Sequence, residues 1–342
     1  PMNVLPYKDL VARLRTLGLT KGQVGALMPD WWDGAAANSS AGAWEFVLMV
    51  SRRLGLDAVA LAGGEVRRLG AVSTPRFKHT ARVSSDDLGP ASLIASALAK
   101  AIVAAMPPKP ALGRLTPAQV REAVLSSGAS RVDFDALLEF AWQRGIPVIP
   151  LPHLPNGVKK MDAAALRVGA RPAIVIARRN ESKAWLSFIL AHELGHILLG
   201  HVPENGSIVE GSIHDTAAFE AESQLDVQER EANDFAHAVL GGEPADAVVS
   251  QWSARASEMQ LVDHALAAAS TLRTAPGQLI LRYAFLTRRW MQASMALRFM
   301  ADDVDAQGAL VNRLRQEIDT AQIGDDMQDF VEKVTGIAAR TV

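Results

Sequence analysis

Two histidines and a glutamate stand at a spacing that can hold and use a metal ion. The segment 185–201 reads WLSFILAHELGHILLGH and contains His192, Glu193 and His196. Histidines four residues apart share one face of a helix, so both imidazoles can reach one zinc ion. Glu193, directly after the first histidine, is placed to accept a proton from water without binding the metal itself. The apolar flanks predict a buried helix, where these polar groups are costly unless a bound ion satisfies them.

A catalytic zinc site needs a third protein ligand and leaves the fourth position open. The chain has no cysteine, so histidine, aspartate and glutamate are the strong ligands on offer. The acidic segment 228–240 supplies two candidates, Glu229 and Glu231. They fall on opposite edges of its apolar face, and periodicity alone does not decide which of them is the third ligand.

Other residues are candidates for supporting roles. Asn233 and Asp234 are expected to orient the histidines through their other ring nitrogens. The strand predicted from Ala173 to Ala177 leads into the metal helix, so we expect it to line the cleft and to pair with an extended substrate. The candidates for stabilising an oxyanion are His201, His214, His237 and Tyr283.

The motif and its surroundings resemble a known family. The pattern F-x-L-A-H-E-L-G-H-I-L-L-G-H at residues 188–201, followed by E-x-E-A-N-x-F-A at residues 229–236, is similar to the ImmA/IrrE metallopeptidases. The resemblance covers about residues 130–240. It implies a zincin-like metallopeptidase core and a gluzincin-like set of ligands, in which a glutamate completes the HExxH histidines.

Carried over residue by residue, the resemblance implies His192, His196 and Glu231 as zinc ligands and Glu193 as the catalytic base. It implies a zinc endopeptidase of a regulatory or stress-response circuit, cleaving a helix-turn-helix repressor or an antitoxin-like partner by Glu193-assisted attack of water. The alternative is a toxin or regulator of a toxin–antitoxin pair, in which the zinc fold serves binding or sensing rather than general proteolysis.

The helices and strands expected around these residues predict an α+β fold that is mostly helical. It has a small sheet and helical regions on both sides. Residues 1–106 predict an N-terminal helical region that is helix-turn-helix-like but degenerate, because Pro29 to Gly42 separate its second and third helices. Residues 111–250 predict the metallopeptidase domain, and residues 251–342 a C-terminal helical region. A proline cluster, Pro107 to Pro110, separates the first two.

Finer patterns predict three elements around the motif. Short strands are expected over Ile146 to Leu151 and Arg171 to Ala177, because both are apolar runs bounded by turn residues. One helix, apolar on more than one face, is expected over Gln278 to Phe299.

Composition excludes several classes of protein. With 49% hydrophobic and 21% charged residues the chain is not intrinsically disordered. No segment is apolar over the roughly 20 residues of a membrane span, and no signal peptide opens the sequence, so a cytoplasmic protein is expected. Residues 1–84 carry 11 basic and 6 acidic side chains, a balance of +5 that is too modest to favour direct DNA binding over a protein partner.

Overall fold

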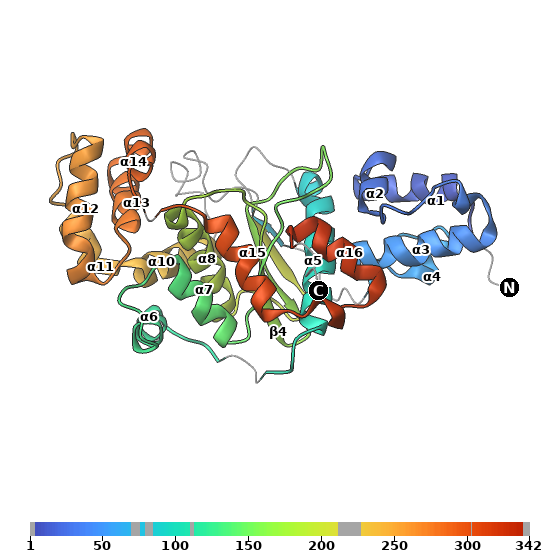
Figure 1. The fold of residues 1–342 in the computed structure, drawn as a ribbon, viewed down its shortest axis with the longest axis horizontal. Coiled ribbons are helices and arrows are strands. Elements are labelled where there is room, and N and C mark those ends of the chain that lie inside the picture. Colours follow the sequence, from blue (N-terminus) through green and yellow to red (C-terminus); the bar gives the residue numbers. More distant parts are fainter. Residues whose placement is uncertain are drawn as a thin grey trace.

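The computed structural model describes residues 4–69, 76–78, 85–109, 113–210, 227–301 and 303–337. The fold is α+β and mostly helical, as the sequence predicts. The sheet and its covering helices occupy the middle of an elongated molecule, with helices α1–α4 at one end and α11–α14 at the other (Figure 1). Among the described residues, no helix combines the length and the apolar character that crossing a membrane requires.

The N-terminal end is a small helical bundle. Its helices are α1 (Tyr7–Leu14), α2 (Lys21–Leu27), α3 (Ser40–Leu54) and α4 (Ala58–Ala62). Thr20 begins α2 with a reciprocal capping box to Gln23, and Asp57 caps α4. A 3₁₀ turn lies in the connection between α2 and α3, so this connection is not the tight turn of a helix-turn-helix motif.

Among the described residues, five strands form the sheet in the order β1-β5-β3-β4-β2. They are β1 (Arg76–Lys78), β2 (Val148–Pro150), β3 (Ala163–Val168), β4 (Arg171–Ile176) and β5 (Ser207–Glu210). The sequence predicts β2 and β4 and misses the other three. The expectation that an extended substrate pairs with the strand Ala173–Ala177 is wrong, because β4 is already hydrogen-bonded to β3 on one side and to β2 on the other.

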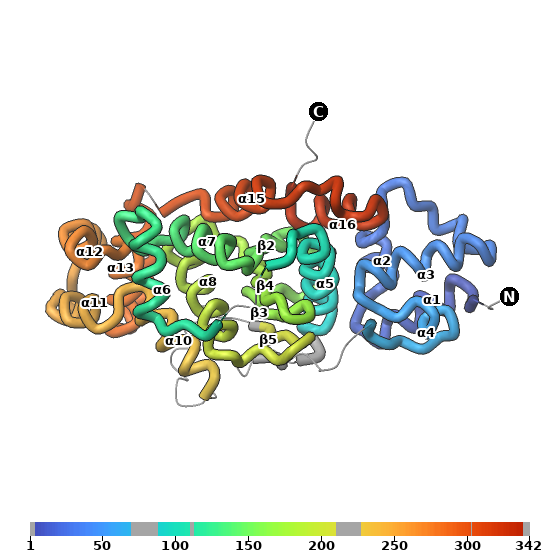
Figure 2. Tube along the Cα trace, turned by 90° about the horizontal axis from the view of Figure 1, so that it is seen from below, coloured from blue at the N-terminus to red at the C-terminus, as the bar shows by residue number. Residues whose placement is uncertain are grey.

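Helices cover both faces of the sheet. Helices α5 and α8 each contact β3 and β4 and lie on opposite sides of the sheet (Figures 1 and 2). Helix α5 therefore belongs with the sheet, although the sequence places it in the N-terminal region. Helices α5 (Ser85–Ala104), α7 (Phe134–Gln143) and α8 (Lys183–Leu198) contact the strands, whereas α6 (Pro117–Ser126) and α10 (Val227–Leu240) pack on α7 and α8.

The C-terminal helices divide between two hydrophobic cores. The first four form a smaller core at the end of the molecule, and the last two return to the main core (Figure 2). The single helix expected over Gln278–Phe299 is wrong: the chain breaks at Arg288, whose φ of 62° lies in the left-handed region. The helices are α11 (Gly242–Val249), α12 (Glu258–Leu272), α13 (Pro276–Thr287), α14 (Trp290–Leu297), α15 (Ala306–Glu317) and α16 (Asp325–Thr335).

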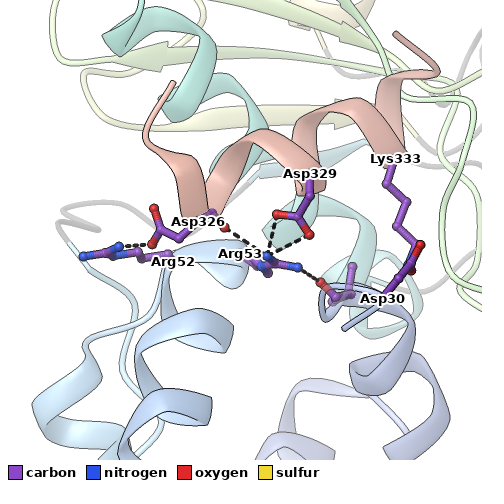
Figure 3. Close-up of polar contacts among 7 residues, drawn as sticks. Asp30, Arg52, Arg53, Asp326, Asp329 and Lys333 are labelled. Atoms are coloured by element: carbon purple, nitrogen blue, oxygen red, sulfur yellow. Dashed lines mark hydrogen bonds and ion pairs between the residues drawn. The ribbon is translucent and has the colours of Figure 1, made fainter. Parts of the chain in front are cut away.

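A buried arginine joins the last helix to the N-terminal bundle (Figure 3). The Arg53 side chain on α3 is fully buried and donates to the backbone oxygens of Leu27 and Asp326. It also donates to the carboxylate of Asp329 on α16, with Nη2 2.8 Å from Oδ1. Segments that are far apart in sequence thus share one charged group at their interface.

Candidate metal centre

Helix α8 carries the two histidines and Glu193 through the interior. Ser182 begins the helix by accepting a hydrogen bond from the backbone N–H of Trp185. Nearly every later side chain of α8 is buried, because the sheet covers one side of the helix and helices α7, α10 and α13 the others. Glu193 and His196 are fully buried and His192 is nearly so.

A Schellman turn ends α8 and returns the chain toward it. Gly200 has a φ of 82°, which glycine adopts without strain. Its N–H donates to the carbonyl of Ile197, and the N–H of His201 donates to the carbonyl of His196 at 2.9 Å. This turn places the His201 side chain beside His196.

Helix α10 lies antiparallel along α8 at unusually close range. Its apolar stripe, including Ala232 and Phe235, packs on α8 at Gly195. A Cβ at Gly195 would lie 3.2 Å from Cβ of Phe235 and 3.3 Å from Cα of Ala232, tighter than ordinary van der Waals contact. The missing side chain at Gly195 therefore allows the approach that brings Glu229 on α10 against His196.

The two histidines and Glu229 form one compact group. The Nε2 atoms of His192 and His196 lie 3.1 Å apart. Oε1 of Glu229 lies 3.3 Å from Nε2 of His196, and Oε2 lies 3.6 Å from Nε2 of His192. One ligand atom from each residue lies within 4.8 Å of the other two, so this group could hold a metal ion.

The structure corrects the position expected for Glu231. Glu231 does not join the two histidines; its half-exposed carboxylate lies 3.0 Å from Nε2 of His201. The physical reason is the way α10 packs on α8. The edge of its apolar face that carries Glu229 is turned toward the two histidines, and the edge that carries Glu231 is turned away from them. Of the two glutamates that periodicity left open, the structure places Glu229, and not Glu231, with the two histidines.

Hydrogen-bond partners fix the histidine rings in the form that binds a metal. Nδ1 of His192 lies 3.0 Å from Oδ1 of Asn233, an acceptor, so the ring proton of a neutral His192 stands on Nδ1 and Nε2 keeps its lone pair. This is the orienting role expected for Asn233. Asp234 is exposed. The residue that contacts His192 is Asn233, directly before it on α10.

His196 is oriented in the same sense through His201. The carboxylate of Glu231 places the proton of His201 on Nε2, which leaves Nδ1 of His201 as an acceptor. Nδ1 of His196 lies 3.0 Å from that atom and carries the proton, so Nε2 of His196 also presents a lone pair. Two lone pairs and the carboxylate of Glu229 therefore converge without a proton between them, which is the chemistry of a cation site.

The electrostatics of the group favour the same protonation states. Burial lowers the pKa of His196 to about 4, although the neighbouring Glu229 carboxylate opposes this shift. Burial alone would raise the pKa of Glu229, but the neighbouring imidazoles of His192 and His196 hold it well below its usual range. At neutral pH the histidine is neutral and the carboxylate ionised, as metal ligation requires.

An aromatic hollow continues the α8–α10 groove away from this group. Phe188 lies one helical turn, about 6 Å, before His192 and packs on His237 of α10 with ring centroids 5.2 Å apart. About 460 Å³ of space in and around the hollow is not filled by atoms, part of it open solvent. Its largest walls are the rings of Trp185, Phe188, Phe285 and Trp290.

The four candidates for an oxyanion donor differ in their positions and contacts. His201 is engaged by His196 and Glu231, and the Tyr283 hydroxyl donates to the backbone oxygen of Ser253 at 3.0 Å. His237 lines the aromatic hollow, and His214 lies outside the described residues. Of the three described candidates, His237 alone keeps a buried ring nitrogen, Nε2, without a hydrogen-bond partner among the described residues.

The sequence reasoning missed the interaction of His201 with Glu231. The signal for it was present: a glycine directly before His201 marks a helix end that folds back on the preceding turn.

Comparisons of the chain with protein-family models, with curated proteins and with solved structures found no match in any of the three.

Proposed function

We propose that this protein is a metal-dependent endopeptidase that holds zinc with His192, His196 and Glu229. The observation that carries the proposal is the convergence of one ligand atom each from His192, His196 and Glu229, with the fully buried Glu193 next to His192 in the sequence. Two histidines, one carboxylate and an adjacent glutamate base are the residue types that hydrolytic zinc sites use. The resemblance to the ImmA/IrrE metallopeptidases supports the same activity.

In this mechanism each residue has one task. A zinc ion held by the three ligands supplies Lewis acidity, which polarises a carbonyl and makes water more acidic. Glu193 accepts the proton of the attacking water and passes it to the leaving amine nitrogen. Asn233, His201 and Glu231 keep the ligand rings in register, so that their lone pairs stay directed at one point.

The aromatic hollow supports a peptide as the substrate class. Its rings offer an apolar surface for a substrate side chain, about one helical turn from His192. Because an extended chain advances about 3.3–3.6 Å per residue, a side chain within two residues of the cleaved bond reaches the hollow. The resemblance favours a helix-turn-helix repressor or an antitoxin-like protein as the natural substrate, and the cytoplasm as the place where they meet.

The test combines metal analysis with cleavage. Zinc bound per chain is measured by mass spectrometry, and cleavage is followed on a mixture of fluorogenic peptides with large apolar residues. Wild type is expected to bind one zinc and to cleave, with activity lost on chelation and restored by zinc. Glu193→Gln is expected to keep zinc and lose at least 1,000-fold in rate, roughly the effect of losing the general base.

The matched control is Glu204→Gln, which removes an exposed carboxylate and is expected to cleave like wild type. Equal cleavage by Glu193→Gln and wild type would overturn the peptidase proposal. If zinc binds but no peptide is cleaved, while Glu193→Gln keeps full biological activity, the alternative is supported: a toxin–antitoxin component that uses the zinc fold for binding or sensing.

A further inference from the structure

A second hollow lies between the N-terminal bundle and the sheet, separate from the metal ligands. About 570 Å³ of space in and around it is not filled by atoms, part of it open solvent. Its walls come from three parts of the fold: the end of α3 and the following segment, helix α5, and strands β3 and β5. The polar side chains that line it are Arg68, Ser96, Lys100, Arg167, Asn205 and Ser207.

The charges in this hollow have one sign. Arg68, Lys100 and Arg167 line it, and no aspartate or glutamate does among the described residues. Within the described part of the chain, none of these three cations forms an ion pair with a carboxylate. Lys100 instead donates to the backbone oxygen of Leu69 at 3.0 Å. Nε of Arg167 is buried and has no hydrogen-bond partner there.

Such a concentration of like charge opposes folding unless something offsets it. Burial lowers the pKa of Arg68, and burial together with the neighbouring Arg68 charge lowers the pKa of Lys100. Arg68 and Lys100 therefore repel each other, and the exposed Lys100 side chain is open to a ligand from solvent. An anion placed between them would relieve this repulsion.

We propose that this hollow binds the phosphate group of a small molecule. Two guanidinium groups and an ammonium group match the several equivalent oxygens of a phosphate and its charge. Ser96 and Ser207 add hydroxyl donors around the same space. Asn205 already accepts a hydrogen bond from the N–H of Gly169 through Oδ1, which leaves its amide protons available. The size of the hollow suits inorganic phosphate or a small phosphomonoester.

The position of the hollow gives this ligand a structural consequence. Arg68 follows the N-terminal bundle, whereas Lys100 and Arg167 stand on α5 and β3 of the central fold. A bound phosphate therefore contacts both parts at once and stabilises their packing. The proposal is independent of the peptidase activity, because the metal ligands line none of this hollow.

The experiment measures binding of two probes, inorganic phosphate and AMP, to the full chain by calorimetry at constant ionic strength. Wild type is expected to bind at least one of them saturably, and sodium chloride alone is expected to give no saturable signal. Lys100→Met and Arg167→Met are expected to weaken binding at least tenfold. The control Lys8→Met removes an exposed cation on α1 and is expected to bind like wild type. Tighter binding of AMP would identify a phosphomonoester, and equal binding the phosphate group alone.

A thermal readout shows that the variants are folded. At low salt and without phosphate, Lys100→Met is expected to melt at the same temperature as wild type or above it, because it removes repulsion from Arg68. Phosphate is expected to raise the melting temperature of wild type more than that of Lys100→Met. The proposal is overturned if wild type binds neither probe, if Lys100→Met and Arg167→Met bind like wild type, or if chelation of metal abolishes the signal, which would place the phosphate at the metal ligands.

Discussion

His196 and His201 face each other through their Nδ1 atoms, which lie 3.0 Å apart. Because Glu231 holds the opposite nitrogen of His201, a chain of two contacts connects an exposed carboxylate to a buried metal-ligand candidate. Glu231, which the resemblance implies as a zinc ligand, thus has a different place. It contacts His196 only through His201, whereas Glu229 contacts both His192 and His196 directly.

The first prediction separates these two glutamates. Glu229→Gln removes the charge that lies against both histidines and is expected to abolish stoichiometric zinc binding. Glu231→Gln leaves the three ligands intact and is expected to lower zinc affinity about 10- to 100-fold, the usual effect of losing a ligand's orienting partner. Competition with a fluorescent chelator at pH 7 measures both. The reverse order of effects would restore Glu231 as the ligand and contradict the geometry described above.

The second prediction concerns the close approach of the two helices. Gly195→Ala places a methyl group against the backbone of Ala232, which must move by a few tenths of an ångström. We expect a loss of about 1–3 kcal/mol in unfolding free energy and weaker zinc binding, since α10 carries Glu229. Urea unfolding and zinc competition check the two effects. The control Gly113→Ala has no heavy atom within 4 Å of the new Cβ and should change neither.

The metal group illustrates what a sequence can and cannot settle. His192, Glu193 and His196 were predictable because their relation is local to one helix. The choice between Glu229 and Glu231 depends on how α10 lies on α8, a tertiary contact that passes through Gly195. One clue was available: Asn233, expected to orient a histidine, stands four residues after Glu229 and so shares its face.

The strands and the broken helix show the same limit. Residues 163–165 of β3 are three alanines, which have low strand propensity, so pairing with β4 decides their conformation. The break after α13 falls at Arg288, where neither glycine nor proline marks a stop. Tertiary packing fixes both features, and local pattern carries no signal for them.

The third prediction is a pH dependence that arises from His237. Burial, followed by the charges of Arg282 and His192, lowers the pKa of His237 to about 3. Its ordinary value applies in the unfolded chain, so between about pH 6.5 and 3 the unfolded state binds a proton that the folded state does not. Stability therefore falls as the pH drops through this range.

The measurement compares wild type with His237→Gln in urea unfolding at pH 7 and pH 5, both with chelator present. Wild type is expected to lose more stability than the variant over this interval. His196 titrates in both proteins, so its contribution cancels in the comparison. Equal losses would show that His237 is protonated as readily in the folded state as in the unfolded chain.

The fourth prediction tests the arginine that joins α3 to α16 (Figure 3). Asp329→Asn removes the charge that faces the fully buried Arg53, whose pKa is lowered by burial and raised by this partner. Because Asp329 is about 40% exposed, we expect a loss of about 1–3 kcal/mol, the range for a hydrogen bond to a charged group. Asp30→Asn, at the exposed Lys333 pair, is the control and is expected to cost less than about 1 kcal/mol. Chemical unfolding measures both, and equal effects would mean that water, not Asp329, satisfies the charge of Arg53.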